Sequence, residues 1–147
     1  MPVFDLRVSM PDPNSPFMKA SAAELLARLP GRPSAPWPQG DRFLQALNHG
    51  SMTVELYAPV GTDPQQPHQQ DELYFVISGT GEFVCGQERS RFDPNTVLFV
   101  PAGAVHRFEN FSADFATWVV FWGAVGGESP SRSQRSSTSS PTEVQGQ

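Results

Sequence analysis

The chain contains three histidines, and two of them stand among residues that suggest metal chemistry. Glu72 follows His68 by four residues, and His106 lies early in a short apolar segment typical of a strand. Two imidazoles and one carboxylate form a donor set that holds divalent transition metal ions and leaves positions open for other ligands. His49 stands beside Gly50 in a predicted turn, with no second histidine or carboxylate near it, so we expect it to be structural or exposed.

The segment between His68 and Glu72 decides whether these two side chains can meet. On one straight strand they would lie about 13 Å apart, too far to share an ion. The residues between them are two glutamines and an aspartate, which are polar and compatible with a turn. A chain reversal there would place the two side chains next to each other. Glu72, Tyr74 and Val76 would then share one face of the following strand, because side chains alternate along a strand.

His106 follows a predicted turn at 101–103. Alternation places His106 and Phe108 on one face of the next strand, opposite Val105 and Arg107. An imidazole that faces a β core needs a partner, because unsatisfied ring nitrogens are costly to bury. Spacing alone therefore leaves two alternatives open for His106, a structural role and a role as a ligand.

The elements that must position these residues are strands. Between Phe43 and Trp122 the sequence has eight short apolar segments separated by turn residues, with no helical run among them. The segments are FLQALN, SMTVELYAP, LYFVI, GEFVC, ERSRF, TVLFV, AVHRFEN and FATWVVFW. Their spacing of roughly ten residues predicts an all-β sandwich or barrel. We place this domain at 41–125.

Residues 1–40 are rich in proline and are expected to form an N-terminal arm. Ser21 and Glu24 have the spacing of a capping box, and three leucines follow at helical intervals before a proline and a glycine. This pattern predicts a short helix over 22–29 that packs its leucines on the barrel.

At the other end we expect 126–147 to be a disordered tail. The last twenty residues contain one strongly apolar residue, Val144, and nine serines or threonines. Such a segment cannot bury enough apolar surface to offset the entropy lost on ordering.

Composition narrows the classes of partner. Ten basic and fifteen acidic residues give a net charge of −5, with Lys19 the single lysine, so we expect neither a nucleic-acid partner nor a membrane partner. The only cysteine, Cys85, excludes an internal disulfide and fits a reducing compartment. We see no signal peptide and no apolar run of the ~18 residues that a spanning helix needs. We therefore expect a cytoplasmic location.

Two groups of residues resemble the motifs of the cupin superfamily. In the first motif a His-x-His pair precedes a Glu by four or five residues, and a Gly follows seven residues after the Glu. Here His68 takes the place of the second His, and Glu72 and Gly79 follow at these distances. Gln66 stands where the first His of the pair falls.

The second cupin motif joins a Gly, five residues, Pro-x-Gly, two residues, His, three residues and Asn. Pro101, Gly103, His106 and Asn110 match this spacing, and Asn95 occupies the place of the first Gly. Fifteen residues separate the two motifs, which resembles the short spacer of small bacterial cupins. The resemblance covers about 43–122.

This resemblance implies a jelly-roll (double-stranded β-helix) barrel. It also implies that His68, Glu72 and His106 bind one divalent transition metal ion: Fe, Mn, Ni or Zn. Because glutamine replaces the first histidine, we expect an open site to which Gln66 could add a carbonyl oxygen, with Gln70 a weaker candidate. The alternative is that the metal has been lost and the three residues hydrogen-bond to one another.

The resemblance leaves two functions open. The first is a mononuclear metalloenzyme, dioxygenase-like or isomerase-like, acting on a small organic molecule. The second is a non-catalytic barrel that binds a small ligand, with a structural metal or none. Gln70, Tyr74 and Phe108 are candidates for the pocket, although the two aromatic side chains could equally fill the core. The last segment is apolar on both faces and cupins of this size are often dimers, so we expect a homodimer.

Overall fold

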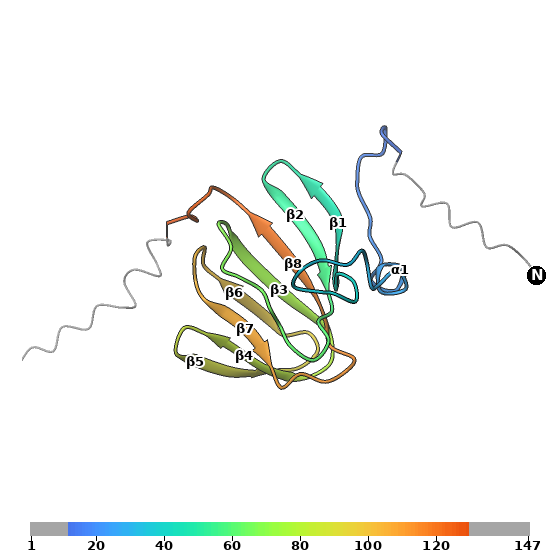
Figure 1. Ribbon diagram of the computed structural model, residues 1–147. Coiled ribbons are helices and arrows are strands. Elements are labelled where there is room, and N and C mark those ends of the chain that lie inside the picture. The colour runs from blue at the N-terminus through green and yellow to red at the C-terminus, as the bar shows by residue number, and fades with distance from the viewer. Residues whose placement is uncertain (1–11, 130–147) are drawn as a thin grey trace, which may run out of the picture.

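The computed structural model describes residues 12–129, and within them the chain is almost entirely β-structure (Figure 1). One short helix, α1 (Ala22–Leu26), precedes eight strands. The strands are β1 (Phe43–His49), β2 (Met52–Tyr57), β3 (Asp71–Ser78), β4 (Gly81–Cys85), β5 (Glu88–Phe92), β6 (Val97–Val100), β7 (His106–Glu109) and β8 (Ala116–Trp122). Each of the eight predicted segments forms one strand.

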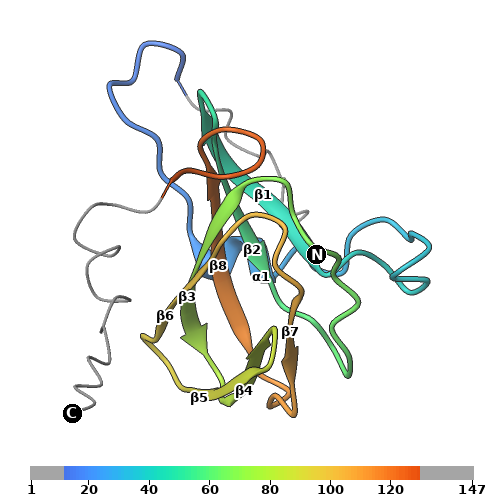
Figure 2. The ribbon, with the colours of Figure 1, turned by 90° about the vertical axis from the view of Figure 1, so that its left-hand side faces the viewer.

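The strands build two antiparallel sheets that face each other (Figure 2). One sheet has the order β1-β2-β8-β3-β6, and the other has the order β5-β4-β7. Strands that are neighbours in a sheet are therefore often distant in sequence, as β2 and β8 are. This crossed connectivity confirms the predicted barrel. It places Glu72 of the first motif and His106 of the second motif on opposite sheets, with β3 facing β7.

Alternation along β3 and β7 points the predicted side chains into the barrel. Glu72, Tyr74 and Val76 are all at most 1% exposed, as the period of two predicts. His106 and Phe108 are also buried, at 3% and 1%.

Of the two places that the sequence left open for Phe108, the pocket and the core, the side chain occupies the core. Its ring packs against four other rings at centroid distances of 4.7 to 5.3 Å. These rings belong to Tyr74, Phe83, Phe92 and Phe115. Aromatic pairs of this kind make Phe108 part of the hydrophobic core of the barrel.

Two turn residues explain parts of the motifs. Asn95, in the place of a glycine, has φ of 71°, and its N–H donates to the carbonyl of Val76 at 2.8 Å. Asparagine is one of the few residues besides glycine that tolerates this left-handed region, so the turn before β6 survives the exchange. Gly79 has φ of 85°, and a Cβ there would lie 2.5 Å from the Cα of Phe115. Only glycine fits at that position.

The N-terminal helix is shorter than the predicted 22–29. It ends at Leu26, after which Arg28 and Leu29 donate to carbonyls three residues back, at 3.0 and 3.2 Å. Leu29 precedes a proline, and the proline ring disfavours helical geometry at the residue before it. α1 lies against β2 and buries Leu25, as expected of a brace.

The chain stays attached to the barrel beyond the predicted end of the domain at residue 125. The N–H of Gly126 donates to the carbonyl of Gln69 at 2.7 Å, and the N–H of Glu128 donates to Oδ2 of Asp71 at 2.9 Å. The first residues assigned to the tail are thus part of the barrel. The prediction of disorder over 130–147 lies outside the described residues. No helix in the described part of the chain is long and apolar enough to cross a membrane.

Candidate metal centre

His68, Glu72 and His106 come together at one end of the barrel. His68 lies in the loop before β3, Glu72 is the second residue of β3, and His106 begins β7. Each offers one ligand atom, and these atoms all lie within 4.8 Å of one another. Donor atoms on opposite sides of a transition metal ion lie about 4.2 Å apart, so a small inward movement would let all three reach one ion.

The chain bends between His68 and Glu72, as the sequence predicts. Residues 69–70 form a bend, and β3 begins at Asp71. His68 is not part of a strand, however. Its carbonyl oxygen accepts a hydrogen bond from the N–H of Gly103, at 2.8 Å, in the loop that leads to His106. The Pro-x-Gly turn of the second motif thereby fixes the histidine of the first.

Glu72 is a buried carboxylate that lacks adequate partners. The residue is 1% exposed, and neither of its oxygens receives a hydrogen bond of good geometry. Nε2 of His106 lies only 2.6 Å from Oε1, and Nε2 of His68 lies 3.9 Å from Oε2. Burying an unpaired carboxylate is costly, so the arrangement calls for a cation among these three side chains. The donor set therefore fits a metal ion.

The backbone fixes which nitrogen of His106 faces Glu72. Nδ1 lies 2.8 Å from the carbonyl oxygen of Ala104, to which it donates its proton. Nε2 is left to face Glu72 and the hydroxyl of Tyr74, 3.0 Å away. A histidine that donates one ring N–H to a backbone carbonyl is the usual arrangement of a metal ligand, because that bond orients the other nitrogen.

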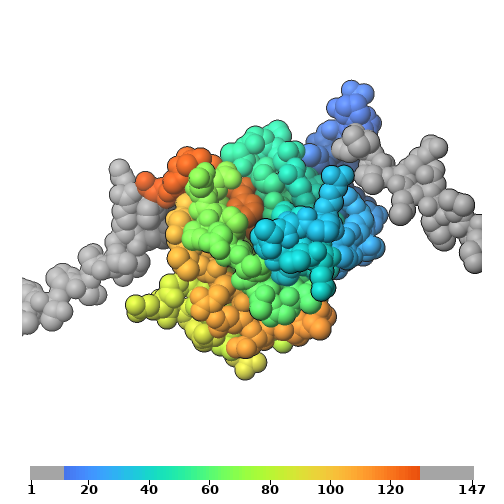
Figure 3. All heavy atoms as spheres, viewed as in Figure 1, coloured from blue at the N-terminus to red at the C-terminus, as the bar shows by residue number. Residues whose placement is uncertain are grey.

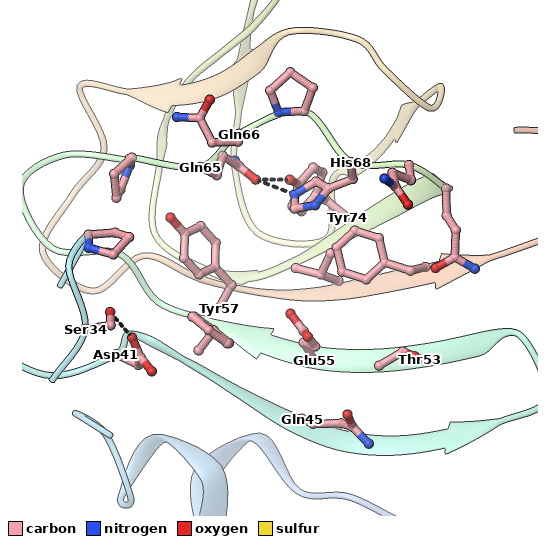
Figure 4. Close-up of a pocket in the computed structure, with 18 of the residues that line it drawn as sticks. Ser34, Asp41, Gln45, Thr53, Glu55, Tyr57, Gln65, Gln66, His68 and Tyr74 are labelled. Carbon is pink, nitrogen blue, oxygen red and sulfur yellow. Dashed lines mark hydrogen bonds between the residues drawn. The ribbon is translucent and has the colours of Figure 1, made fainter. Parts of the chain in front are cut away.

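Gln65, not Gln66, is the glutamine that reaches the cluster. The hydroxyl of Tyr74 donates to Oε1 of Gln65 at 2.8 Å, and the same oxygen lies 3.4 Å from Nε2 of His68 (Figure 4). Gln66 is exposed, and its amide makes no hydrogen bond within the described residues. Gln70 is committed elsewhere, since its Nε2 donates to the carbonyl oxygens of Ser51 and Gly123 at 3.1 and 3.0 Å.

Asp63 holds Gln65 in place, and sequence reasoning missed it. Oδ2 of Asp63 accepts from Nε2 of Gln65 at 2.6 Å and from the N–H of Phe108 at 2.8 Å. Its Oδ1 accepts from the hydroxyl of Tyr57. The surrounding loop has no periodic pattern, so only its polar, proline-rich composition hinted that side chains there could turn inward.

Burial and the charge of Glu72 shift the titration of the cluster. Burial lowers the pKa of the His68 imidazole. Burial also acts to lower the pKa of His106, but the close contact with Glu72, the bond to the Ala104 carbonyl and the charge of Glu72 outweigh it, and the pKa lies above its ordinary value. Burial and the charge of Glu72 raise the pKa of Tyr74 well above its ordinary value, so its hydroxyl keeps its proton.

The cluster opens into a cleft of about 870 Å³. The inner faces of β1, β2 and β8 form one wall, the loop at 64–70 forms another, and the segment around Trp37 and Asp41 closes one end. Figure 3 shows this N-terminal segment, in cyan, against the green loop. His68 and Tyr74 line the cleft, whereas Glu72 and His106 lie beneath them. A bound ion would be reached from this side.

Comparison with known proteins agrees with this geometry. Residues 53–122 match the family described as Cupin domain. An uncharacterised protein of Streptomyces coelicolor, SCO3923, is 44% identical over 81 residues, which are 54% of this chain and 77% of that protein. The chain is a member of the cupin family.

Solved structures resemble this chain in fold. KdgF from Halomonas sp. superposes with a TM-score of 0.50 at 14% identity, over 56% of this cupin and 77% of that chain. A Cupin 2 conserved barrel domain protein from Salinispora arenicola matches with a TM-score of 0.49 at 20% identity, over 56% and 75% of the two chains. At these identities the likeness concerns the fold alone.

Proposed function

We propose that this cupin binds one divalent transition metal ion (Fe, Mn, Ni or Zn) through His68, Glu72 and His106 and acts on a small organic molecule held in the adjoining cleft. The buried Glu72 carboxylate carries the proposal, because a cation between the two imidazoles would satisfy oxygens that no donor satisfies. Three protein ligands leave coordination positions open.

A bound ion would supply a Lewis acid to polarise a substrate oxygen, or redox chemistry with O₂ if it is iron. The chain's own residues position the substrate beside it. Tyr74 keeps its proton and donates a hydrogen bond to the amide oxygen of Gln65, which orients that oxygen next to His68. Asp63 keeps that amide oriented. Dioxygenase-like and isomerase-like reactions both remain compatible with this set.

The alternative function is a non-catalytic barrel that binds a small ligand. In that case the metal is structural or absent, and the ion pair between His106 and Glu72 stabilises the cluster by itself. The metal content of the purified protein distinguishes the two functions. Protein purified without chelator is analysed for transition metals, and a redox-active ion at one per chain supports the enzyme. A folded protein with no ion, which takes up none when offered Fe(II), Mn(II), Ni(II) or Zn(II), supports the binding barrel.

We also propose that the chain forms a homodimer through the outer apolar face of the five-stranded sheet. Phe75, Val97 and Phe99 are 42%, 52% and 56% exposed there. The other members of this face are Leu73, Trp118, Val120 and Trp122. The side chains named here are all uncharged, so a two-fold axis that sets them against their copies brings no like charges of these residues together. Light scattering at micromolar concentration should give twice the chain mass, and Phe99→Glu should give the monomer mass. A monomer mass for the unmodified chain would contradict this proposal.

A further inference from the structure

The charges of the cleft beside the metal centre are of one sign. Glu55 and Asp41 line it, and no lysine or arginine does so within the described residues. The nearest arginine in sequence, Arg42, uses its Nε to donate to the carbonyl oxygen of Ala58 at 2.8 Å. A cleft built for phosphate or carboxylate groups would be expected to present such cations, because arginine matches both anions with paired hydrogen bonds.

Glu55 is a carboxylate on the cleft wall that β2 forms. It lies on the inner face of β2, between Gln45 of β1 and Val119 of β8, and its side chain rises into the cleft (Figure 4). The residue is half-buried, and no lysine or arginine of the described residues lies within ion-pair distance of it. Its charge is therefore directed at whatever enters the cleft.

The carboxylates behind the wall add to this charge. Glu72 belongs to the metal cluster and Asp63 lies beside it, and neither has a lysine or arginine partner among the described residues. Burial raises the pKa of the Glu55 carboxyl, and the charge of Glu72 raises it further, so the field of the metal centre reaches Glu55. A bound divalent ion would bring two positive charges against the three negative charges of Glu55, Asp63 and Glu72. The cleft would stay negative even with metal bound.

The remaining lining offers flat apolar surface and amides. Trp37, Phe43 and Phe121 contribute aromatic rings, and glutamines supply several donors and acceptors. Aromatic faces, amides and carboxylates together suit a molecule that carries hydroxyl or ammonium groups on an apolar frame.

We propose that Glu55 makes the cleft selective for a substrate without phosphate or carboxylate groups, whose hydroxyl or ammonium group donates a hydrogen bond to the Glu55 carboxylate. Anionic analogues are rejected by like charge, which is a common way in which sites achieve specificity. The inference rests on the proposed function in taking this cleft as the substrate site. It does not require that the metal be present.

Fluorescence quenching of Trp37, a residue of the cleft wall, tests the charge directly. The wild type and each variant are prepared both with Trp37 and with the substitution Trp37→Phe. The fluorescence of the Trp37→Phe form is subtracted, which leaves the signal of Trp37 alone. Iodide, caesium and acrylamide serve as anionic, cationic and neutral quenchers, with metal-free full-length chain at pH 8. For each quencher, the quenching constant is divided by the constant of neutral acrylamide. Glu55→Gln should raise this ratio for iodide and lower it for caesium. Glu55→Lys should raise the iodide ratio by about twofold or more.

The matched control is Glu88→Lys, in β5 on the other sheet, which changes the net charge equally. If Glu55→Lys alters the quenching ratios no more than Glu88→Lys does, the inference is wrong. Circular dichroism checks each fold, and Glu55→Gln carries the test if Glu55→Lys does not fold. Elemental analysis is independent of this result. A metal-free wild-type chain with the expected quenching would end the proposal of a metalloenzyme but leave the charge selection in place.

Discussion

The backbone N–H of Gly103 donates a hydrogen bond to the carbonyl oxygen of His68 at 2.8 Å. This bond joins the loop that carries His68 to the loop that leads to His106. Each loop therefore helps to position the histidine of the other. Asp71 adds a second connection, because its Oδ1 accepts from the N–H of Ala102 at 2.9 Å. The metal centre is thus held by hydrogen bonds between the segment around His68 and Asp71 and the loop that leads to His106.

Gly103→Ala should disturb this connection. Gly103 has φ of 79° with open space around it, so alanine would introduce backbone strain without a clash, at a cost of about 1 kcal/mol. Gly86→Ala is the control, since Gly86 has φ of 58° and equally open surroundings in the turn between β4 and β5. We expect similar losses of unfolding free energy in urea for both variants, but weaker metal binding only for Gly103→Ala. Equal metal affinities would show that the loop connection does not position His68.

Gln65 and Gln66 form a matched pair of adjacent glutamines. Gln65→Ala removes the amide oxygen that lies near His68 and accepts from Tyr74, so we expect metal affinity to fall by about 10-fold, as for other residues that orient ligands. Gln66→Ala should leave the affinity unchanged, because Gln66 is exposed. Calorimetric titration of both variants checks this. If Gln66→Ala weakens metal binding more than Gln65→Ala does, Gln66 is the residue that acts in place of the missing cupin histidine.

The stability of the metal-free protein should depend on pH through His106. Its pKa is raised in the folded state, so the folded protein binds the proton more tightly than the unfolded chain does. The stabilisation is fully present below about pH 6.5 and is lost as the pH rises through the folded pKa. The unfolding free energy of the wild type should therefore exceed that of His106→Gln by most at pH 6 and by least at pH 9. A difference that grows with pH would contradict the ion pair with Glu72.

Two truncations should separate the barrel from the remainder of the chain. Removing 130–147 should leave the melting temperature unchanged, because this segment has almost nothing apolar to bury. Removing 126–147 also deletes the backbone N–H groups that donate to Gln69 and to the buried Asp71. An unsatisfied buried acceptor lowers the unfolding free energy by about 1–3 kcal/mol. The shorter chain should melt several degrees lower. Identical melting curves would show that these bonds contribute nothing.

The sequence was most informative where a period or a motif constrained the chain. All eight strands and the inward faces of β3 and β7 could be predicted, because alternation and turn residues determine them. The meeting of His68, Glu72 and His106 was implied by the resemblance to the cupin motifs, since spacing alone left the role of His106 open. The loop before β3 follows no period. Its direction depends on tertiary hydrogen bonds, which is why Gln65 and Asp63 were missed in favour of Gln66. The sequence left Phe108 open between pocket and core, because alternation gives the face of a residue but not its depth in the barrel.

Calorimetric titration of the chelator-treated full-length chain with Fe(II), Mn(II), Ni(II) and Zn(II) tests the metal centre most directly. We expect one ion per chain for at least one of these metals. His68→Ala and His106→Ala should abolish binding and Glu72→Gln should weaken it, with the sheet signal in circular dichroism preserved. His49→Ala is the control, because His49 is exposed in β1 and should bind as the wild type does. No uptake of any of the four ions by the wild type, or full uptake by His106→Ala, would contradict the account.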